Sequence, residues 1–259
     1  MKRGVYFLFF VLVLLLTGCG GHKQAKAPLP SIPPAIPAPA QQPAETNGQP
    51  APSEPQSEKA RQAEASQPEI SIPADAKPLA VESGLASWYG APYHNRRTSN
   101  GEIYDMHAMT AAHRTLPLGS VARVTNIKTG HSALVRITDR GPFIEGRILD
   151  LSLAAAQKLD VWLPGTAMVR MEVMQTPVPL ETGGRWAVQI GAINTEKSAA
   201  DLSDRLTRRY RTADVLRFRS PVGNWWVRVR VLNDDRKRAE EVARDTQTTQ
   251  GSVFLVRLD

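Results

Sequence analysis

Short runs of alternating apolar and polar residues fill the middle of the chain and constrain its fold class. Residues 121–127 and 132–138 both alternate, as does a β-strand with one buried face. The segment 128–130 between them is a short, glycine-containing hairpin connection. Further strands are predicted at residues 84–89, 108–112 and 167–173, and one helix at 152–159 with Ser152 as its N-cap. Many short strands with one helix predict a small closed β-barrel over residues 79–175.

Residues 185–259 follow a different pattern, in which strands and helices alternate. Strands are predicted at residues 185–190, 213–220, 225–231 and 252–258, with helices at 195–210 and from Asp234 onward. This β-α-β-β-α-β order predicts a ferredoxin-like sandwich with both helices on one face of the sheet. The prolines and the Gly183-Gly184 pair of residues 176–184 mark a linker between the two domains.

Alternation also predicts which side chains of this sheet point away from the helices. The apolar positions Trp186, Val188 and Ile190 share one parity and should face the helices. The opposite parity is shared by Gln189, Trp226, Arg228 and Arg230. A tryptophan beside arginines and an amide on a flat, open sheet is typical of a polymer-binding surface, so we expect one here.

The first residues predict export from the cytoplasm. A basic start is followed by an apolar run, Val5–Leu16, that is too short to span a membrane. Leu16-Thr-Gly-Cys19 resembles the bacterial lipobox, which implies a signal peptide at residues 1–18 and lipidation of Cys19, the only cysteine. An ordinary cleaved signal with an incidental cysteine is the alternative. By the same resemblance, Gly20 favours the periplasmic face of the outer membrane.

Residues 19–78 are rich in proline, alanine and glutamine, and this composition predicts a disordered, semi-rigid spacer. The chain carries a net charge of +7, which suits an anionic or polar polymer. The candidate partners are nucleic acid, a membrane surface and cell-wall glycan, and export places nucleic acid out of reach. We expect no cofactor, and the histidines lack the spacing of a metal site.

The barrel segment carries a set of ordered motifs. They are Ala86–Gly90, Thr98–Asp105, Thr110–His113, Thr115–Gly119, Val124–Asn126, Asp139–Phe143 and Gly146–Ser152. Together they resemble the rare lipoprotein A family. The resemblance implies a six-stranded double-psi β-barrel and endolytic lytic transglycosylase activity on peptidoglycan. It further implies that Glu102, His113 and Asp139 are tied to activity.

Glycoside cleavage needs an acid for the leaving oxygen and a group that stabilises the cation-like transition state. In a lytic transglycosylase the muramoyl C6 hydroxyl replaces water, so one carboxyl can serve first as acid and then as base. We assign proton transfer to Asp139, since alternation gives it the parity of the inward-facing Val135 and Ile137. Glu102 would stabilise the cation, and the reverse assignment remains open. His113 would orient a carboxyl or a sugar hydroxyl.

Further residues of these motifs are candidates for substrate contact or for structural support. Substrate contacts in the barrel are expected from Trp88, Tyr89, Asn100 and Arg140. Core packing is an equal alternative for at least one of the two aromatic residues. Asp105 and Asp150 are assigned to structural support. Asn95 stands where the family often has glycine, and asparagine tolerates left-handed backbone.

The second domain resembles SPOR domains through Trp186–Gly191 and Trp226–Val229. That resemblance implies binding of septal glycan stripped of stem peptides, through Gln189, Trp226 and Arg228. Ala192 replaces a serine of the usual motif. The combined expectation is a lipid-anchored enzyme of the division septum, for which association with divisome proteins or amidases is also expected. The alternative is an inactive glycan-binding or wall-loosening lipoprotein.

Overall fold

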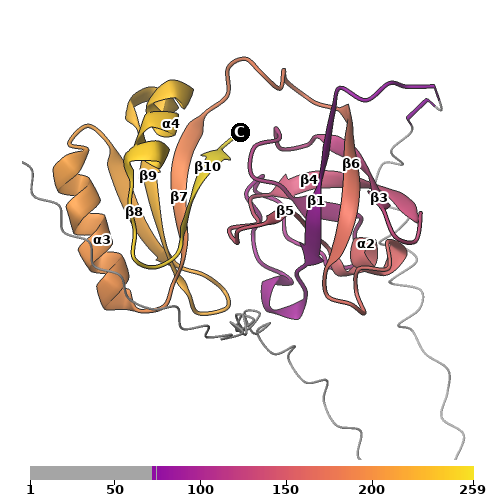
Figure 1. Ribbon diagram of the computed structural model, residues 1–259, viewed down its shortest axis with the longest axis horizontal. Helices are drawn as coiled ribbons and strands as arrows, with labels where there is room; N and C mark the ends of the chain where they lie inside the picture. The colour runs from indigo at the N-terminus through magenta and orange to yellow at the C-terminus, as the bar shows by residue number, and fades with distance from the viewer. Residues whose placement is uncertain (1–71, 74) are drawn as a thin grey trace, which may run out of the picture. The chain divides into compact units, whose positions relative to one another are not determined.

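The computed structural model describes residues 72–73 and 75–259 (Figure 1). The predicted signal peptide, Cys19 and nearly all of the predicted spacer lie outside these residues. Within the described part of the chain, no helix is long and apolar enough to cross a membrane.

The first domain is a closed barrel of six strands, as predicted. Its strands are β1 (Ala80–Trp88), β2 (Thr110–Ala112), β3 (Val121–Asn126), β4 (Ser132–Asp139), β5 (Arg147–Leu151) and β6 (Ala167–Gln175). They close in the order β1-β5-β2-β4-β3-β6. The β1–β5 and β2–β4 pairs are parallel, and the others are antiparallel. Neighbours distant in sequence therefore meet, and β2 lies between β4 and β5.

The boundaries of a strand differ from the prediction where hydrogen bonding to a neighbouring strand extends it beyond the alternating sequence pattern. β1 begins at Ala80 instead of Gly84 because its first half pairs with β6, from Ala80 opposite Val173. The short helix α2 (Leu153–Lys158) begins after Ser152, whose hydroxyl accepts a hydrogen bond from the Ala155 amide as an N-cap. A 3-10 turn, η1, spans Ala91–Tyr93.

The barrel interior is filled by the inward-facing residues of the alternating strands. Val124, Val135, Ile137, Leu149 and Leu151 are all fully buried in one apolar cluster. The predicted inward parity of Val135 and Ile137 is thus confirmed. This core anchors the strand ends from which the candidate site is built.

The second domain has the predicted β-α-β-β-α-β order. It comprises β7 (Trp186–Ile193), α3 (Glu196–Arg209), β8 (Asp214–Arg219), β9 (Trp225–Arg230), η2 (Leu232–Asp234), α4 (Arg236–Asp245) and β10 (Ser252–Arg257). The antiparallel sheet runs β10-β7-β9-β8, drawn in orange to yellow in Figure 1. α3 packs on β8 and β9, and α4 packs on β7 and β10. Trp186, Val188 and Ile190 face these helices, as predicted.

Asn126 joins the end of β3 to the end of α2. Its buried Nδ2 donates to the Leu159 carbonyl at 2.8 Å, and its Oδ1 accepts from the Lys128 amide at 2.9 Å. Asn126→Ala leaves the buried carbonyl without this donor, so the free energy of unfolding should fall by about 1–3 kcal/mol in urea denaturation. The control Lys128→Ala changes an exposed side chain and should stay within about 0.5 kcal/mol of the parent. Equal losses in both variants would contradict this role.

Candidate functional site

The turn formed by Thr98–Glu102 docks on the end of β4. The Asn100 amide donates to the Thr138 carbonyl at 3.1 Å, and the Ser99 amide donates to Asp139 Oδ1 at 3.0 Å. The structure therefore brings together the two segments that sequence analysis grouped into one site.

The Asp139 carboxylate is held through one of its oxygens. Oδ1 accepts from the Ser99 amide, from the Ser99 hydroxyl at 2.5 Å and from the Arg140 amide at 2.8 Å. Among the described residues Oδ2 accepts no hydrogen bond, and the side chain is half-buried. One oxygen is thus used for orientation, and the other is available to a ligand.

A β-bulge aims Asp139 away from the barrel core. Ala111 pairs with Ile137, but Ala112 pairs with Asp139, so Thr138 is the extra residue. Ala111 and Ile137 point into the core, and Ala112 therefore points to the outer face together with Asp139. The parity argument placed Asp139 with the inward residues, and the bulge overturns it.

Glu102 lies at the exposed end of the same turn. Its backbone carbonyl accepts from the Thr98 amide at 2.8 Å, while its carboxylate makes no hydrogen bond or ion pair among the described residues. Asn100 Oδ1 accepts from the Thr98 hydroxyl at 2.6 Å and the Glu102 amide at 3.0 Å. The Asn100 oxygen, predicted to contact substrate, is therefore occupied in bracing the turn.

His113 is buried and orients a carboxyl, but that carboxyl is Glu82. Its Nδ1 accepts from the amides of Thr115 and Leu116, at 3.2 and 3.0 Å, so the neutral ring carries its proton on Nε2. Nε2 then donates to Glu82 Oε2 at 3.2 Å. Only the His113 backbone reaches the site, where its amide donates to the Asp139 carbonyl at 3.1 Å.

This pair shifts the pKa values of both partners downward. The hydrogen bond from His113 lowers the pKa of Glu82, whereas burial lowers the pKa of His113. Glu82 lies in β1 and His113 directly follows β2. The pair therefore joins two segments that support the candidate site.

Arg140 also braces the scaffold. Its buried guanidinium donates to the carbonyls of His113 and Leu116, at 3.1 and 2.7 Å, and to the Asp259 carbonyl at 2.6 Å. Burial lowers the pKa of Arg140 to about 10. These partners bind its two terminal nitrogens inside the protein, away from the substrate role predicted for it.

Asp150 is a second carboxyl on the outer face, and sequence reasoning gave it only a structural role. It pairs with Ala112 on one side and with Ser87 on the other. The Ser87 hydroxyl donates to Asp150 Oδ1 at 2.7 Å, and Arg147 lies 3.3 Å from Oδ2. Burial raises the pKa of Asp150 despite these two partners, and the charge of Asp139 adds to the shift.

Three tyrosines cluster beside the two aspartates. The rings of Tyr89 and Tyr104 stack with centroids 4.4 Å apart, and Tyr93 meets Tyr89 edge-on at 5.6 Å. Burial raises the pKa of each, with a further contribution from the negative charge of Asp139. Asn95, at the end of this loop, has φ 61°, as expected for asparagine in a glycine position.

The Trp88 side chain packs against the barrel core and does not lie beside the aspartates. Its ring is partly buried against the barrel cluster and lies close to Gly90, where an added Cβ would be 2.7 Å from the ring. Of the two aromatic residues predicted to stack on sugars, Tyr89 is the one beside the aspartates. Tyr93 and Ser99 were missed as site residues, although both lie in segments that the sequence analysis had singled out.

The second-domain sheet places Gln189, Trp226 and Arg228 on the face away from the helices. Arg228 Nε donates to Gln189 Oε1 at 2.8 Å, and its guanidinium lies over the Phe218 ring. This face is not open as expected, because Trp226 packs edge-on against Phe143 at 5.3 Å and Gln189 is fully buried. Phe143 comes from the loop that follows Asp139.

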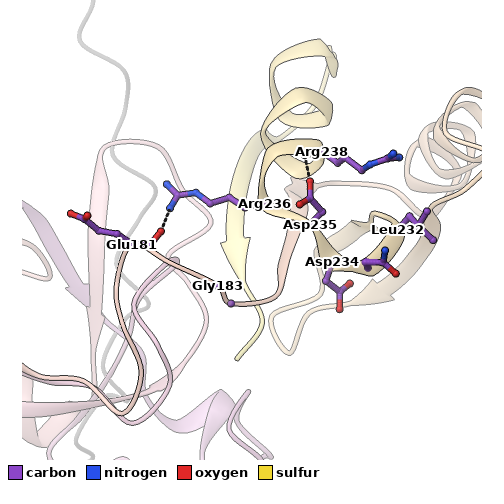
Figure 2. A pocket seen from close by; sticks show the side chains of 9 residues that line it. Glu181, Gly183, Leu232, Asp234, Asp235, Arg236 and Arg238 are labelled. Carbon is purple, nitrogen blue, oxygen red and sulfur yellow. Dashed lines mark hydrogen bonds between the residues drawn. The ribbon is translucent and has the colours of Figure 1, made fainter.

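A hollow beside η2 is lined by residues of the linker, of η2 and of the start of α4 (Figure 2). Asp234 lines the hollow, is buried, and accepts hydrogen bonds from Arg185 and Arg230, each at 2.8 Å. Asn233 and Asp234 have φ values of 59° and 50°, the conformation that a glycine commonly supplies. The ion pairs hold this turn in a left-handed conformation. No cluster of three or more metal-ligand side chains occurs in the described residues.

Comparisons with known proteins agree with this architecture. Residues 81–171 match the family model described as lytic transglycolase, and residues 182–257 match that of the SPOR domain. A Vibrio cholerae protein named endolytic peptidoglycan transglycosylase RlpA is 59% identical over 99 residues, which are 38% of either chain. A Helicobacter pylori protein of the same name is 39% identical over 151 residues, 48% of either chain. The matched stretch thus spans less than half of each relative.

The described part of the chain therefore joins a barrel that matches the lytic transglycolase model to a domain that matches the SPOR model. The order of the two domains is the one that the motifs predicted. Over the matched residues the chain is similar to proteins named RlpA, in agreement with its resemblance to the rare lipoprotein A family.

The His113–Glu82 pair predicts how stability depends on pH. Both groups bind fewer protons in the folded than in the unfolded chain, so stability rises with pH. The part due to His113 is complete above its ordinary pKa, about 6.5, and is lost as the pH falls below it. In His113→Asn, whose amide oxygen can replace Nδ1 as acceptor, the slope of unfolding free energy between pH 7 and 5 should decrease by up to about 1.4 kcal/mol per pH unit.

The measurement is urea denaturation at several pH values, with His131→Asn as the matched control. His131 is exposed and pairs with the exposed Asp160. Its replacement should leave the slope close to that of the parent. A parental slope in His113→Asn would show that His113 titrates alike in both states.

Proposed function

We propose that the barrel is a lytic transglycosylase that cleaves the bond between N-acetylmuramic acid and N-acetylglucosamine in peptidoglycan. The observation that carries the proposal is the fixed Asp139 carboxylate, with one oxygen held by three donors and the other available. Glu102 supplies a second carboxylate on the docked turn. The names of the curated relatives support the same activity.

The reaction needs little from the protein besides carboxyls and placement. Protonation of the glycosidic oxygen breaks its bond to muramoyl C1, and a cation-like centre develops at C1. The C6 hydroxyl of the same sugar then attacks C1, and a carboxylate takes its proton. The products are a 1,6-anhydro-muramoyl end and a free hydroxyl on the neighbouring sugar, with no water consumed.

Asp139 is the carboxylate that we assign to proton transfer, through Oδ2. Glu102 stabilises the charge at C1 or orients the sugar, since its carboxylate is exposed on the turn that Asp139 itself holds in place. Tyr89 and Tyr93 provide aromatic surface for a sugar ring next to these acids. His113 and Arg140 act on the reaction only through the backbone that they brace.

We place the protein in the cell envelope, anchored by a lipid on Cys19 and acting at the division septum. This part of the proposal depends on the lipobox-like sequence, the proline-rich spacer and the SPOR domain. The SPOR sheet face with Trp226 and Arg228 would bind glycan stripped of its stem peptides. Binding there requires Phe143 to move off Trp226. Association with divisome proteins or amidases remains part of this proposal.

Asp139→Asn tests the catalytic assignment. The purified protein is incubated with peptide-free glycan strands, and 1,6-anhydro products are quantified by mass spectrometry. The rate should fall by about 100-fold or more, because an amide cannot take the proton. Glu145→Gln alters an exposed carboxylate in the same loop and should keep the parental rate. Parental protein without any 1,6-anhydro product would instead support the alternative of an inactive glycan-binding protein.

Trp226→Ala tests the binding surface of the second domain. Retention on amidase-treated sacculi should fall about tenfold, since loss of a central tryptophan typically removes more than 1 kcal/mol of binding energy. Lys237→Ala, on the exposed side of α4, should bind like the parent. Equal binding of the parent to intact and amidase-treated sacculi would refute selectivity for stripped glycan.

A further inference from the structure

The loop between α2 and β6 exposes large apolar side chains on the surface of the barrel. Leu159 and Val161 are fully buried in the barrel core and fix the start of this loop. Trp162 and Leu163, which follow them, are 42% and 85% exposed. The Gly165 amide donates to the Trp162 carbonyl at 3.3 Å, so a tight turn carries Leu163 at its tip. The core beneath the loop therefore holds an apolar tip in solvent.

A second apolar segment lies beside this loop. The Ile127 amide donates to the Met168 carbonyl at 3.0 Å, next to the last residue pair of β3 and β6. Val169 points into the core, so Met168 points outward, as does Ile127 opposite it. Ile127 and Met168 are 56% and 50% exposed. The ion pair of His131 with Asp160 also joins the turn after Ile127 to the loop. We name four exposed side chains the apolar patch: Ile127, Trp162, Leu163 and Met168.

Basic side chains flank the apolar patch. Residues 127–131 and 158–168 include the exposed Lys128 and Lys158, and their only acid is Asp160, which is paired with His131. Lysine next to exposed tryptophan and leucine is typical of protein surfaces that lie in the headgroup region of an anionic bilayer. Charge and apolar surface therefore favour the same kind of partner.

The size of the patch favours lipid over a second protein. Each partner in a stable protein complex of standard size buries roughly 800 Å². Four partly exposed side chains offer less than this area. Shallow insertion into the interface of a bilayer requires only a small apolar tip with basic neighbours, because lipid adapts its shape to the protein.

The apolar patch and the candidate site lie at opposite ends of β4. The turn after Ile127 leads into β4 at Ser132, and β4 ends at Asp139. A strand of eight residues can keep its ends up to roughly 23 Å apart. A bilayer in contact with the patch would therefore leave Asp139 accessible to a polymer.

We propose that the apolar patch docks the barrel on the surface of a phospholipid bilayer that contains anionic lipids. Trp162 and Leu163 insert between the headgroups. Lys128 and Lys158 interact with the lipid phosphates. The contact orients the barrel, so that the end of β4 that carries Asp139 is directed away from the lipid.

This contact is separate from the lipid on Cys19, although the inference rests on the proposed function for the presence of a membrane. A lipid on Cys19 with a spacer over residues 19–78 would keep the barrel at high effective concentration beside the bilayer. A weak contact through the patch then suffices to orient the barrel, because the second binding event is intramolecular.

Co-sedimentation with vesicles of phosphatidylethanolamine and phosphatidylglycerol tests the patch. The chain from residue 19 onward carries Cys19→Ser, so that neither the apolar leader nor a lipid can bind the vesicles. Leu163→Glu should lower the partition coefficient about tenfold, because a charge replaces the side chain that enters the bilayer interface. Val222→Glu is the matched control, since it places the same charge at an exposed apolar position of the second domain. It should bind like the parent.

A second variant tests the charges separately. Lys128→Gln combined with Lys158→Gln should lower binding to the same vesicles about fivefold for each lysine. Binding to vesicles of phosphatidylcholine alone, which carry no net charge, should stay at the parental level. A parental partition coefficient of the double variant on the anionic vesicles would contradict the role of the two lysines.

The proposal is overturned if the parent does not sediment with the vesicles or if Leu163→Glu binds as well as the parent. A parent that dimerises in sedimentation equilibrium, with a Leu163→Glu variant that does not, would show that a second copy covers the patch. Mass spectrometry of the protein from cell membranes tests the lipid on Cys19. Its absence would refute the proposed anchor without changing the vesicle result, so the two failures are distinguishable.

Discussion

The site depends on the position of β2 between β4 and β5, combined with one extra residue in β4. Pairing of Ala112 with Asp139 on one side and Asp150 on the other places both acids in a single row. The bulge at Thr138 turns Asp139 out of the core, where an unpaired carboxylate would be costly. Without the bulge, the alternation that buries Ile137 would bury Asp139 as well.

Around this row, the residues divide into those that hold the backbone and those that remain available. His113 forms hydrogen bonds with Glu82 and with backbone amides, and Arg140 donates to backbone carbonyls. They fix the loops on which Asp139 and its neighbours stand. The free oxygen of Asp139, the exposed carboxylate of Glu102 and the tyrosine rings are left for a ligand.

The sheet of the second domain has one apolar and one polar face, and both faces are covered. Its helix-facing residues form the core, and its opposite face gathers Trp226, Arg228 and Gln189. Phe143 closes that face in this structure by packing on Trp226 and Phe254. The loop that carries Phe143 directly follows Asp139, so one segment of chain links the candidate site to this sheet face.

The sequence alone determined the β-barrel, the βαββαβ domain and the core faces, because alternation, turn residues and ordered motifs are local properties of the chain. It also named Asp139 and Glu102 and grouped their segments. Only the tertiary structure decided that Asp139 faces outward, that His113 binds Glu82, and that Asp150 stands beside Asp139. Each of these depends on pairing between strands distant in sequence, and on a bulge that leaves no mark in the periodicity of β4.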